Sequence, residues 1–218
     1  ALLYTHYIQL IEAGEINPTP AMTVHQGSPT TVSIDGDGGL GMLVSHRAMV
    51  ECLRMADEFG SGWATVYNST HSAAGAHYVR MATARRMIGF HWSTGGSTIA
   101  VPGGKGRLLG NNPFSFGAPA AANAPFIFDM APSTTIRPKI RLHALEGRAL
   151  PDGWTVDADG ASITDPVEFF EKEGAILPLG STPDNGAYKG FGLLLMSDVM
   201  GGVQDDVKLP PSSGVNIP

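Results

Sequence analysis

The feature that most constrains the fold of this sequence is its alternation of two periodicities. Short runs rich in β-branched and aromatic residues, such as residues 63–69, are typical of strands. Longer runs with apolar residues every three or four positions, such as Leu43–Phe59, are typical of amphipathic helices that end at a glycine, here Gly60. The predicted strands cover residues 30–34, 63–69, 88–93, 114–119 and 126–131. The predicted helices cover residues 2–13, 43–59, 75–87, 134–146, 164–174 and 189–203, with Pro138 delaying or kinking the fourth and Thr164 as N-cap of the fifth.

No internal repeat and no long linker divides the chain. Its 218 residues, 43% of them apolar, are enough for one core or for two intertwined lobes that share one. With 28 glycines, 16 prolines and only 16% charged residues, the composition fits a loop-rich α/β enzyme better than a coiled coil or a disordered chain. We therefore expect an α/β fold with a mixed sheet and flanking helices.

Charge and composition also exclude several classes of partner. The formal net charge is -6 and no Lys/Arg run is present, which argues against a nucleic-acid partner. No apolar stretch reaches the roughly 20 residues of a membrane span. The single cysteine, Cys52, lies in a predicted helix and favours a reducing, cytoplasmic setting. No Cys/His cluster has zinc spacing, so we predict no metal site.

Residues Gly36–Gly41 satisfy the spacing G-x-G-x-x-G between a predicted strand and a predicted helix. In a Rossmann domain such a loop holds a dinucleotide, and Glu58 lies at about the right distance downstream for a ribose contact. The regular βαβαβ succession of that domain is missing, however. A tight loop in which glycine permits positive φ is therefore the favoured interpretation.

His71 lies among small residues in the segment NSTHSAAG, just after a predicted strand and before a predicted helix. A histidine with a pKa near neutrality suits a base that removes a hydroxyl proton, and small neighbours leave room for a ligand. A capping or hydrogen-bonding histidine is the alternative. The other histidines have no comparable loop context and are interpreted as structural: His6, His25, His46, His77, His91 and His143.

Two further segments could contact a cofactor. After LGNNPFSF, the predicted strand FIFDMA ends in Asp129, Met130 and Ala131, and could present backbone amides and one carboxylate at a sheet edge. Asp129 could equally cap the next turn. Lys189 stands at a glycine-lined helix start, where its charge and free N–H groups favour an anion such as a phosphate, although a solvated lysine is the alternative.

Taken in order, these segments resemble the malate/L-lactate dehydrogenase family that includes sulfolactate and ureidoglycolate dehydrogenases and the piperideine-carboxylate reductases. The matching pieces are YIQLIEAGEINPTP, DGDGGLG, NSTHSAAG, MIGF, VPGG, LGNNPFSFGAP, FIFDMAPS, GWTVDADG, TDP and YKGFGLLLM. The resemblance implies a mixed α/β fold of the sulfolactate dehydrogenase type, distinct from the Rossmann fold, and a homodimer. It places the proton-transferring histidine at His71. It places the cofactor contacts at Asp129, Met130, Ala131, Lys189, Thr94 and Gly95.

The chain also departs from the family pattern. Family members carry a Ser-His-Gly segment and a substrate-binding arginine just before the first predicted helix, and an ungapped comparison puts Leu3 at that arginine. A C-terminal stretch that closes over the cofactor has no counterpart after Pro218. We therefore expect residues 1–218 to be a single catalytic core without these two segments.

The resemblance implies hydride transfer between NAD or NADP and C2 of a small 2-hydroxy or 2-oxo acid. NADPH-dependent reduction of a cyclic imine acid is the alternative activity, although Lys139 stands near a position where some of these reductases carry an acid. A catalytically silent NAD(P)-binding relative is the third hypothesis. The main hypothesis requires His71 and residues 129–131 to converge on one nicotinamide-sized cleft.

Overall fold

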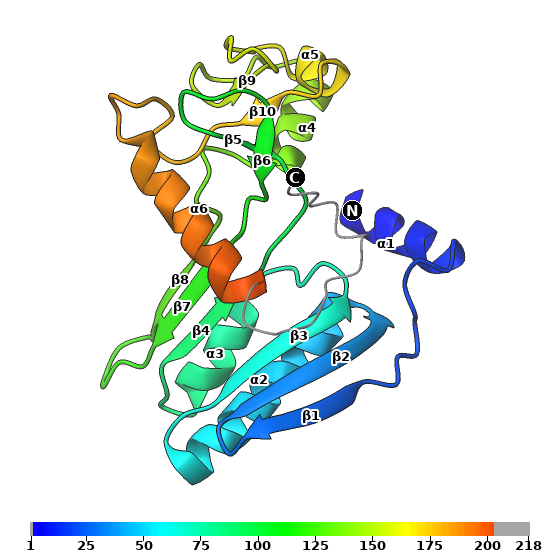
Figure 1. Ribbon diagram of the computed structural model, residues 1–218, viewed down its shortest axis with the longest axis vertical. Helices are drawn as coiled ribbons and strands as arrows, with labels where there is room; N and C mark the ends of the chain where they lie inside the picture. The colour runs from blue at the N-terminus through cyan, green and yellow to red at the C-terminus, as the bar shows by residue number, and fades with distance from the viewer. Residues whose placement is uncertain (1, 203–218) are drawn as a thin grey trace. The chain divides into compact units, whose positions relative to one another are not determined.

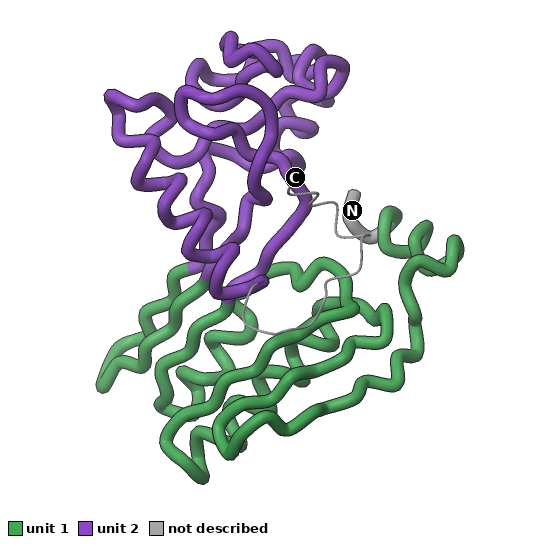
Figure 2. Tube along the Cα trace, in the orientation of Figure 1, with its two compact units in different colours: residues 1–91, 115–128 green, residues 92–114, 129–218 purple. Residues whose placement is uncertain are grey.

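The computed structural model describes residues 2–202, with side chains from residue 5 onward. The side chain of Leu3 and the expected helix end at Val203 lie outside this description. The chain divides into two compact units (Figure 2). Unit 1 consists of Ala1–His91 and Ser115–Phe128, and unit 2 consists of Trp92–Phe114 and Asp129–Pro218. The chain therefore passes between the units three times.

Unit 1 is built from a mixed three-stranded sheet, two packed helices and parts of a second sheet (Figure 1). Its elements are α1 (Leu2–Glu12), β1 (Thr23–Ser28), β2 (Thr31–Gly39), α2 (Gly41–Phe59), β3 (Trp63–Ser69) and α3 (Ala76–Ala84). The first sheet has the order β1-β2-β3, in which β2 pairs antiparallel with β1 and parallel with β3. The second sheet has the order β4-β7-β8, formed by Gly89–Trp92, Phe114–Ala118 and Phe126–Met130.

Helices α2 and α3 form the core of unit 1. The apolar face of α2 packs on the first sheet through Val44, Ala48 and Met55, which meet Val32 and Ile34 of β2. The next face of α2 packs against α3, with Met49 and Leu53 against Tyr78 and Ala82. This spacing of buried residues is the one expected for a helix that is covered on two sides.

Unit 2 is organised around a four-stranded sheet with the order β6-β5-β10-β9. Its elements are β5 (Ile99–Ala100), β6 (Arg107–Leu109), α4 (Arg137–Leu145), β9 (Thr155–Val156), α5 (Pro166–Glu171), β10 (Ala175–Ile176) and α6 (Ala187–Gly202). One core cluster joins side chains from three of its strands, all three of its helices and the loops between them: Ile99, Leu109, Ile140, Leu150, Ile163, Phe169, Ile176 and Leu194. The last of these comes from α6, which is thereby anchored to the sheet.

The predicted α/β class is confirmed, and the element positions agree with the sequence in most places. Helix α2 ends at Gly60, which adopts the left-handed conformation with φ 86°. Helix α4 begins at Arg137 with Pro138 in its first turn, so the proline delays the helix and does not kink it. Within the described residues, no helix is long and apolar enough to cross a membrane.

One capping prediction is wrong. The N-cap of α5 is Asp165, not Thr164, because the Asp165 side chain accepts a hydrogen bond of 2.8 Å from the Val167 N–H. Proline at the next position leaves the first helical residue without an N–H, and a carboxylate is favoured at this end of the helix dipole. The residue directly before Pro166 is therefore the better cap.

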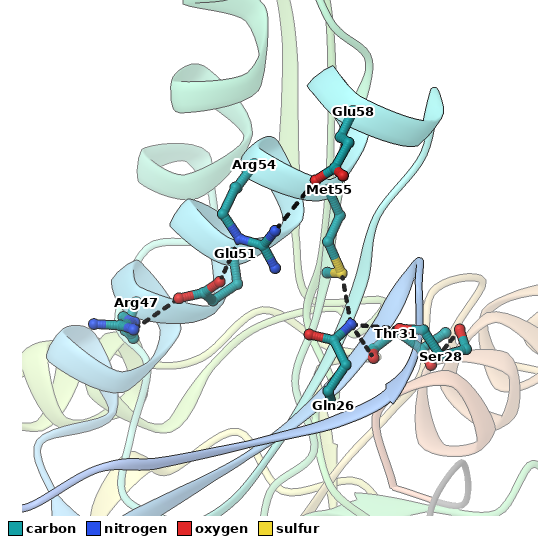
Figure 3. Close-up of polar contacts among 8 residues, drawn as sticks. All are labelled: Gln26, Ser28, Thr31, Arg47, Glu51, Arg54, Met55 and Glu58. Atoms are coloured by element: carbon teal, nitrogen blue, oxygen red, sulfur yellow. Dashed lines mark hydrogen bonds and ion pairs between the residues drawn. The ribbon is translucent and has the colours of Figure 1, made fainter.

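Glu51 of α2 is a buried carboxylate, 8% exposed, that lies between Arg47 and Arg54 (Figure 3). Arg47 Nη2 lies 2.7 Å from Oε1, and Arg54 Nε lies 3.1 Å from Oε2. Burial by itself raises the pKa of Glu51, but the hydrogen bonds and positive charges of Arg54 and Arg47 outweigh it and lower the pKa. The charged form is therefore the one that stabilises the fold.

We expect Glu51→Gln to lower the free energy of unfolding by about 1–2 kcal/mol at neutral pH, because both arginines lose a charged acceptor. Since the folded-state pKa lies below the ordinary value of 4.5, this contribution is present above that pH and is lost as the pH falls through the folded value. Urea unfolding at neutral and at acidic pH measures both effects. Glu58→Gln is the matched control, because the Glu58 side chain is 59% exposed and 3.6 Å from Arg54, and should change stability by less than about 0.5 kcal/mol. Equal stability of Glu51→Gln and wild type at neutral pH would contradict this account.

Candidate active site

His71 lies in the loop between β3 and α3, and the start of this loop is fixed to the start of α2. The Gly41 N–H donates to Thr70 Oγ1 at 3.1 Å, and the Thr70 N–H donates to the Gly39 carbonyl at 3.2 Å. The residue immediately before His71 is thus held by two hydrogen bonds. This anchoring gives the imidazole a defined position within unit 1.

The glycine run that matches G-x-G-x-x-G has a packing role here. A Cβ at Gly41 would lie 1.9 Å from the Thr70 carbonyl oxygen, and a Cβ at Gly36 would lie 2.7 Å from the Asn68 carbonyl oxygen. Among these glycines only Gly38 has a positive φ, at 67°, next to Asp37 with a φ of 49°. The glycines therefore let β2 and α2 approach the strand and loop that carry His71.

The side chain of His71 is paired with Tyr7 of α1, 64 residues earlier in the sequence. Tyr7 Oη lies 2.6 Å from His71 Nδ1, and the two rings stack with an interplanar angle of 24°. Loss of contact with water lowers the pKa of His71 and raises the pKa of Tyr7. At neutral pH the pair therefore holds an uncharged imidazole and an uncharged phenol. Sequence reasoning did not find Tyr7, because its position in the α1 pattern carries no signal of a distant partner.

The rest of the loop combines backbone strain with tight packing. Ala73 has a φ of 58°, a left-handed conformation that costs a non-glycine residue about 1 kcal/mol. The Ser72 carbonyl accepts a hydrogen bond from Tyr78 Oη, and a Cβ at Gly75 would lie 2.0 Å from Ser115 Oγ. Strain that is held by surrounding contacts is common at functional sites.

Three other histidines have side-chain contacts away from His71. His143 is buried, and its Nδ1 lies 2.9 Å from the Ala149 carbonyl oxygen. His46 and His77 are exposed and lie against each other, with Nδ1 and Nε2 3.2 Å apart. No group of three or more potential metal ligands occurs within the described part of the chain.

The chain neighbours of two predicted cofactor segments, Asp129–Ala131 and Lys189, both lie against Leu179 in unit 2. The Leu179 N–H donates to the Pro132 carbonyl at 3.2 Å, directly after Ala131. A Cβ at Gly190 would lie 2.5 Å from the Leu179 nitrogen, so this glycine allows α6 to rest on the same residue. Lys189 is exposed in the first turn of α6 and forms no ion pair with any residue that the structure describes.

Thr94 and Gly95 form an exposed turn at the other end of α6. A Cβ at Gly201 would lie 3.1 Å from Thr94 Cγ2, so this turn lies against the last residues of the helix. Lys189 and Gly201 are 12 residues apart, which is about 18 Å along a helix axis. One small ligand cannot reach both ends, whereas an extended dinucleotide can. His71 belongs to unit 1 and all the cofactor residues to unit 2, so their convergence stays a prediction.

A hollow with a volume of about 510 Å³ lies near the opposite end of α2 from Gly41. It is bordered by Gln26, Gly27, Ser28, Pro29, Arg54, Glu58 and Phe59. Its charged groups, Arg54 and Glu58, already neutralise each other. We therefore give it no role in the chemistry of His71.

Residues 2–208 match the family model described as Malate/L-lactate dehydrogenase. The chain belongs to this family. The predicted family is confirmed.

Three comparisons show the range of this malate/L-lactate dehydrogenase family. The chain is 35% identical to a malate dehydrogenase of Pyrococcus horikoshii over 198 residues, which cover 90% of the chain and 54% of that protein. It is 30% identical to a Delta(1)-pyrroline-2-carboxylate reductase of Agrobacterium fabrum over 197 residues, covering 90% and 55%. The solved sulfolactate dehydrogenase of Methanocaldococcus jannaschii superposes with a TM-score of 0.78 at 34% identity, covering 91% and 56%.

These comparisons confirm the predicted fold type, which is that of the sulfolactate and malate dehydrogenase structures of this family. The chain spans about half the length of the relatives that it matches. The named relatives are dehydrogenases and reductases.

Proposed function

We propose that the protein transfers a hydride reversibly between NAD(P) and C2 of a small 2-hydroxy or 2-oxo acid, with His71 moving the hydroxyl proton. The observation that carries this proposal is the position of the His71 imidazole, whose Nδ1 lies 2.6 Å from Tyr7 Oη, in a chain of the malate/L-lactate dehydrogenase family. The names of the relatives, malate dehydrogenase and L-sulfolactate dehydrogenase, support the substrate class.

The proton chemistry follows from the Tyr7 contact. With its proton on Nδ1, the imidazole donates to Tyr7 Oη and leaves Nε2 free to accept the hydroxyl proton of the substrate. A lowered pKa keeps His71 unprotonated near neutrality, as a base requires. In the reverse direction His71 returns the proton to the oxygen that forms at C2. When bound, the nicotinamide supplies the hydride chemistry itself.

The residues of unit 2 would hold the cofactor. The exposed Lys189 ammonium at the start of α6 suits a phosphate, and the Asp129 carboxylate suits a hydroxyl or amide donor. The turn at Thr94 and Gly95 offers an exposed backbone at the far end of α6. Met130 and Ala131 would complete the contact beside Asp129.

We further propose a homodimer in the cytoplasm, as the family resemblance implies. Burial raises the pKa of Cys52 to about 11, so this thiol stays protonated and unreactive. An inert single cysteine is consistent with a reducing compartment.

Reduction of a cyclic imine acid is the second candidate function. It is favoured by the relatives named Delta(1)-pyrroline-2-carboxylate reductase. Against it, residue 139 is a lysine, and its Nζ lies 4.7 Å from the centre of the Trp154 ring, where it brings a positive charge and not an acid. The 2-hydroxy acid remains the preferred substrate class.

Steady-state assays of the protein separate these functions. Oxaloacetate and pyruvate are compared with piperideine-2-carboxylate, each with NADH and with NADPH, through the absorbance of the reduced nicotinamide. We expect a higher kcat/KM for the 2-oxo acids. Turnover of the cyclic imine alone would establish the second function, and binding of the cofactor without any turnover would identify a silent relative.

A further inference from the structure

Asn112, in the loop between β6 and β7, is a fully buried residue with an unusual backbone. Its exposed fraction is 0%, and its φ is 32°, in the left-handed region. Asparagine tolerates this region better than most residues, although the conformation is still costly. A buried polar side chain in a costly conformation indicates that its contacts hold it there.

Both ends of the Asn112 amide are occupied. The Gly95 N–H donates to Oδ1 at 3.2 Å. Nδ2 donates to the Leu194 carbonyl at 3.3 Å and to Asp198 Oδ1 at 2.9 Å. Because one side faces a donor and the other faces two acceptors, only one orientation of the amide satisfies all three contacts.

These contacts join two parts of unit 2 that would touch the cofactor. Gly95 belongs to the exposed turn, whereas Leu194 and Asp198 belong to α6, the helix that begins beside Lys189. A Cβ at Gly110 would lie 2.3 Å from the Gly95 carbonyl oxygen and 2.5 Å from Asn112 Oδ1. The turn is therefore packed on the Asn112 loop from one side and remains exposed on the other.

We propose that Asn112 is a positioning residue for cofactor binding, which fixes the Thr94–Gly95 turn to α6 through Gly95 and Asp198. This inference rests on the proposed function, in which the turn contacts NAD(P). When either half of the amide is lost, the turn is no longer linked to α6 through residue 112, and the cofactor has to order it on binding. That ordering cost appears as weaker binding and leaves the chemical step unchanged.

Asn112→Asp tests the donor half of the amide. The carboxylate keeps an acceptor for Gly95 but faces Asp198 and the Leu194 carbonyl with no donor. We expect the Kd for the reduced cofactor to rise about tenfold or more, with kcat at saturating cofactor retained. Combining Asn112→Asp with Asp198→Asn reverses donor and acceptor and should recover part of the affinity, because only the Leu194 carbonyl then lacks its donor.

A second pair of variants keeps the test decisive if Asn112→Asp does not fold. Asp198→Asn retains an acceptor oxygen for Nδ2, whereas Asp198→Ala removes it, so only the alanine variant should bind the cofactor more weakly. Fluorescence titration with NADH and with NADPH gives Kd, and thermal unfolding gives Tm for each variant. A purely structural role for Asn112 would lower Tm and leave Kd of the folded protein unchanged.

The outcomes separate this inference from the proposed function. Wild-type protein that binds neither NADH nor NADPH overturns both. Wild-type binding with an unchanged Kd in Asn112→Asp, or with the same Kd in Asp198→Ala and Asp198→Asn, overturns the role of Asn112 alone. Weaker binding that the reversed pair partly rescues supports it.

Discussion

Replacing His71 by alanine lowers the turnover of the 2-hydroxy acid by about 10²–10⁴-fold, which is the usual contribution of a positioned general base. The reason is that the hydroxyl proton must then pass to water, while the hydride acceptor remains in place. Cofactor affinity should be preserved, because the proposed cofactor contacts all belong to unit 2. Measurements of kcat at saturating cofactor and of the cofactor Kd separate the two effects.

His77→Ala is the matched control for this variant. His77 is also an exposed histidine of unit 1, and its ring contacts His46 and Tyr78 and not Tyr7. Its turnover should equal that of wild type. If His71→Ala kept full turnover, His71 would have no part in the proton transfer.

The pH dependence of the wild-type enzyme gives a second measure of the same role. Because loss of hydration lowers the pKa of His71 below its ordinary value of 6.5, the base form persists to a lower pH than that of a free imidazole. The acidic limb of kcat/KM for hydroxy-acid oxidation should therefore fall below pH 6.5 and be absent in His71→Ala. A limb above that value would show that burial does not control this histidine.

The sequence predicts the long elements of this fold well, because their periodicity and their caps agree. Residues 63–69 form β3 as expected, and α2 ends at Gly60. The two-residue strands β5, β9 and β10 were not predicted, since a strand of this length has no periodicity and exists only through its neighbours in the sheet. Strand β1 was also missed, because most of its side chains are exposed and only Val24 and Ser28 are partly buried.

Strand β2 shows how tertiary pairing overrides local sequence. The glycine-rich residues Gly36–Gly39 were expected to form a loop, yet β2 runs through them to Gly39, which pairs with Ser69 of β3. The same pairing explains the small side chains, because Cβ atoms at Gly36 and Gly41 would collide with the His71 strand and loop. A single sequence cannot show why glycine is needed at these positions, because the atoms that a Cβ would meet belong to residues about 30 positions further along the chain.

In the candidate site, too, contacts between residues far apart in the sequence could not be predicted. His71 and Lys189 could be singled out because local sequence marks them, the first by small neighbours and the second by a glycine-lined helix start. Tyr7 and Asn112 could not, because their roles depend on partners far along the chain, at His71 and at Asp198. Local pattern thus finds groups that could react or bind, and the three-dimensional structure finds the groups that hold them.

Gly41→Ala should be the most destabilising small substitution in this region, with a loss of about 3 kcal/mol in the free energy of unfolding. The added Cβ would lie 1.9 Å from the Thr70 carbonyl oxygen and 2.7 Å from the His71 carbonyl carbon, and real Cβ contacts are essentially never closer than 3.0 Å. The backbone must therefore separate by about 1 Å, because neither atom belongs to a flexible side chain. Urea unfolding, with the midpoint and slope compared with wild type, measures the loss.

The same displacement acts on the residue next to Thr70, which is His71. A misplacement of about 1 Å in a reacting group can cost on the order of 10²-fold in rate, so the folded fraction of Gly41→Ala should also turn over more slowly. Gly192→Ala is the matched control: nothing lies within 4 Å of the added Cβ, and alanine inside α6 should stabilise the helix by up to about 1 kcal/mol. Near-wild-type stability of Gly41→Ala would mean that the start of α2 is not closely packed against the loop that carries His71. If Gly41→Ala lost stability but kept full turnover per folded molecule, the packing of Gly41 would matter for the fold and not for the position of the His71 base.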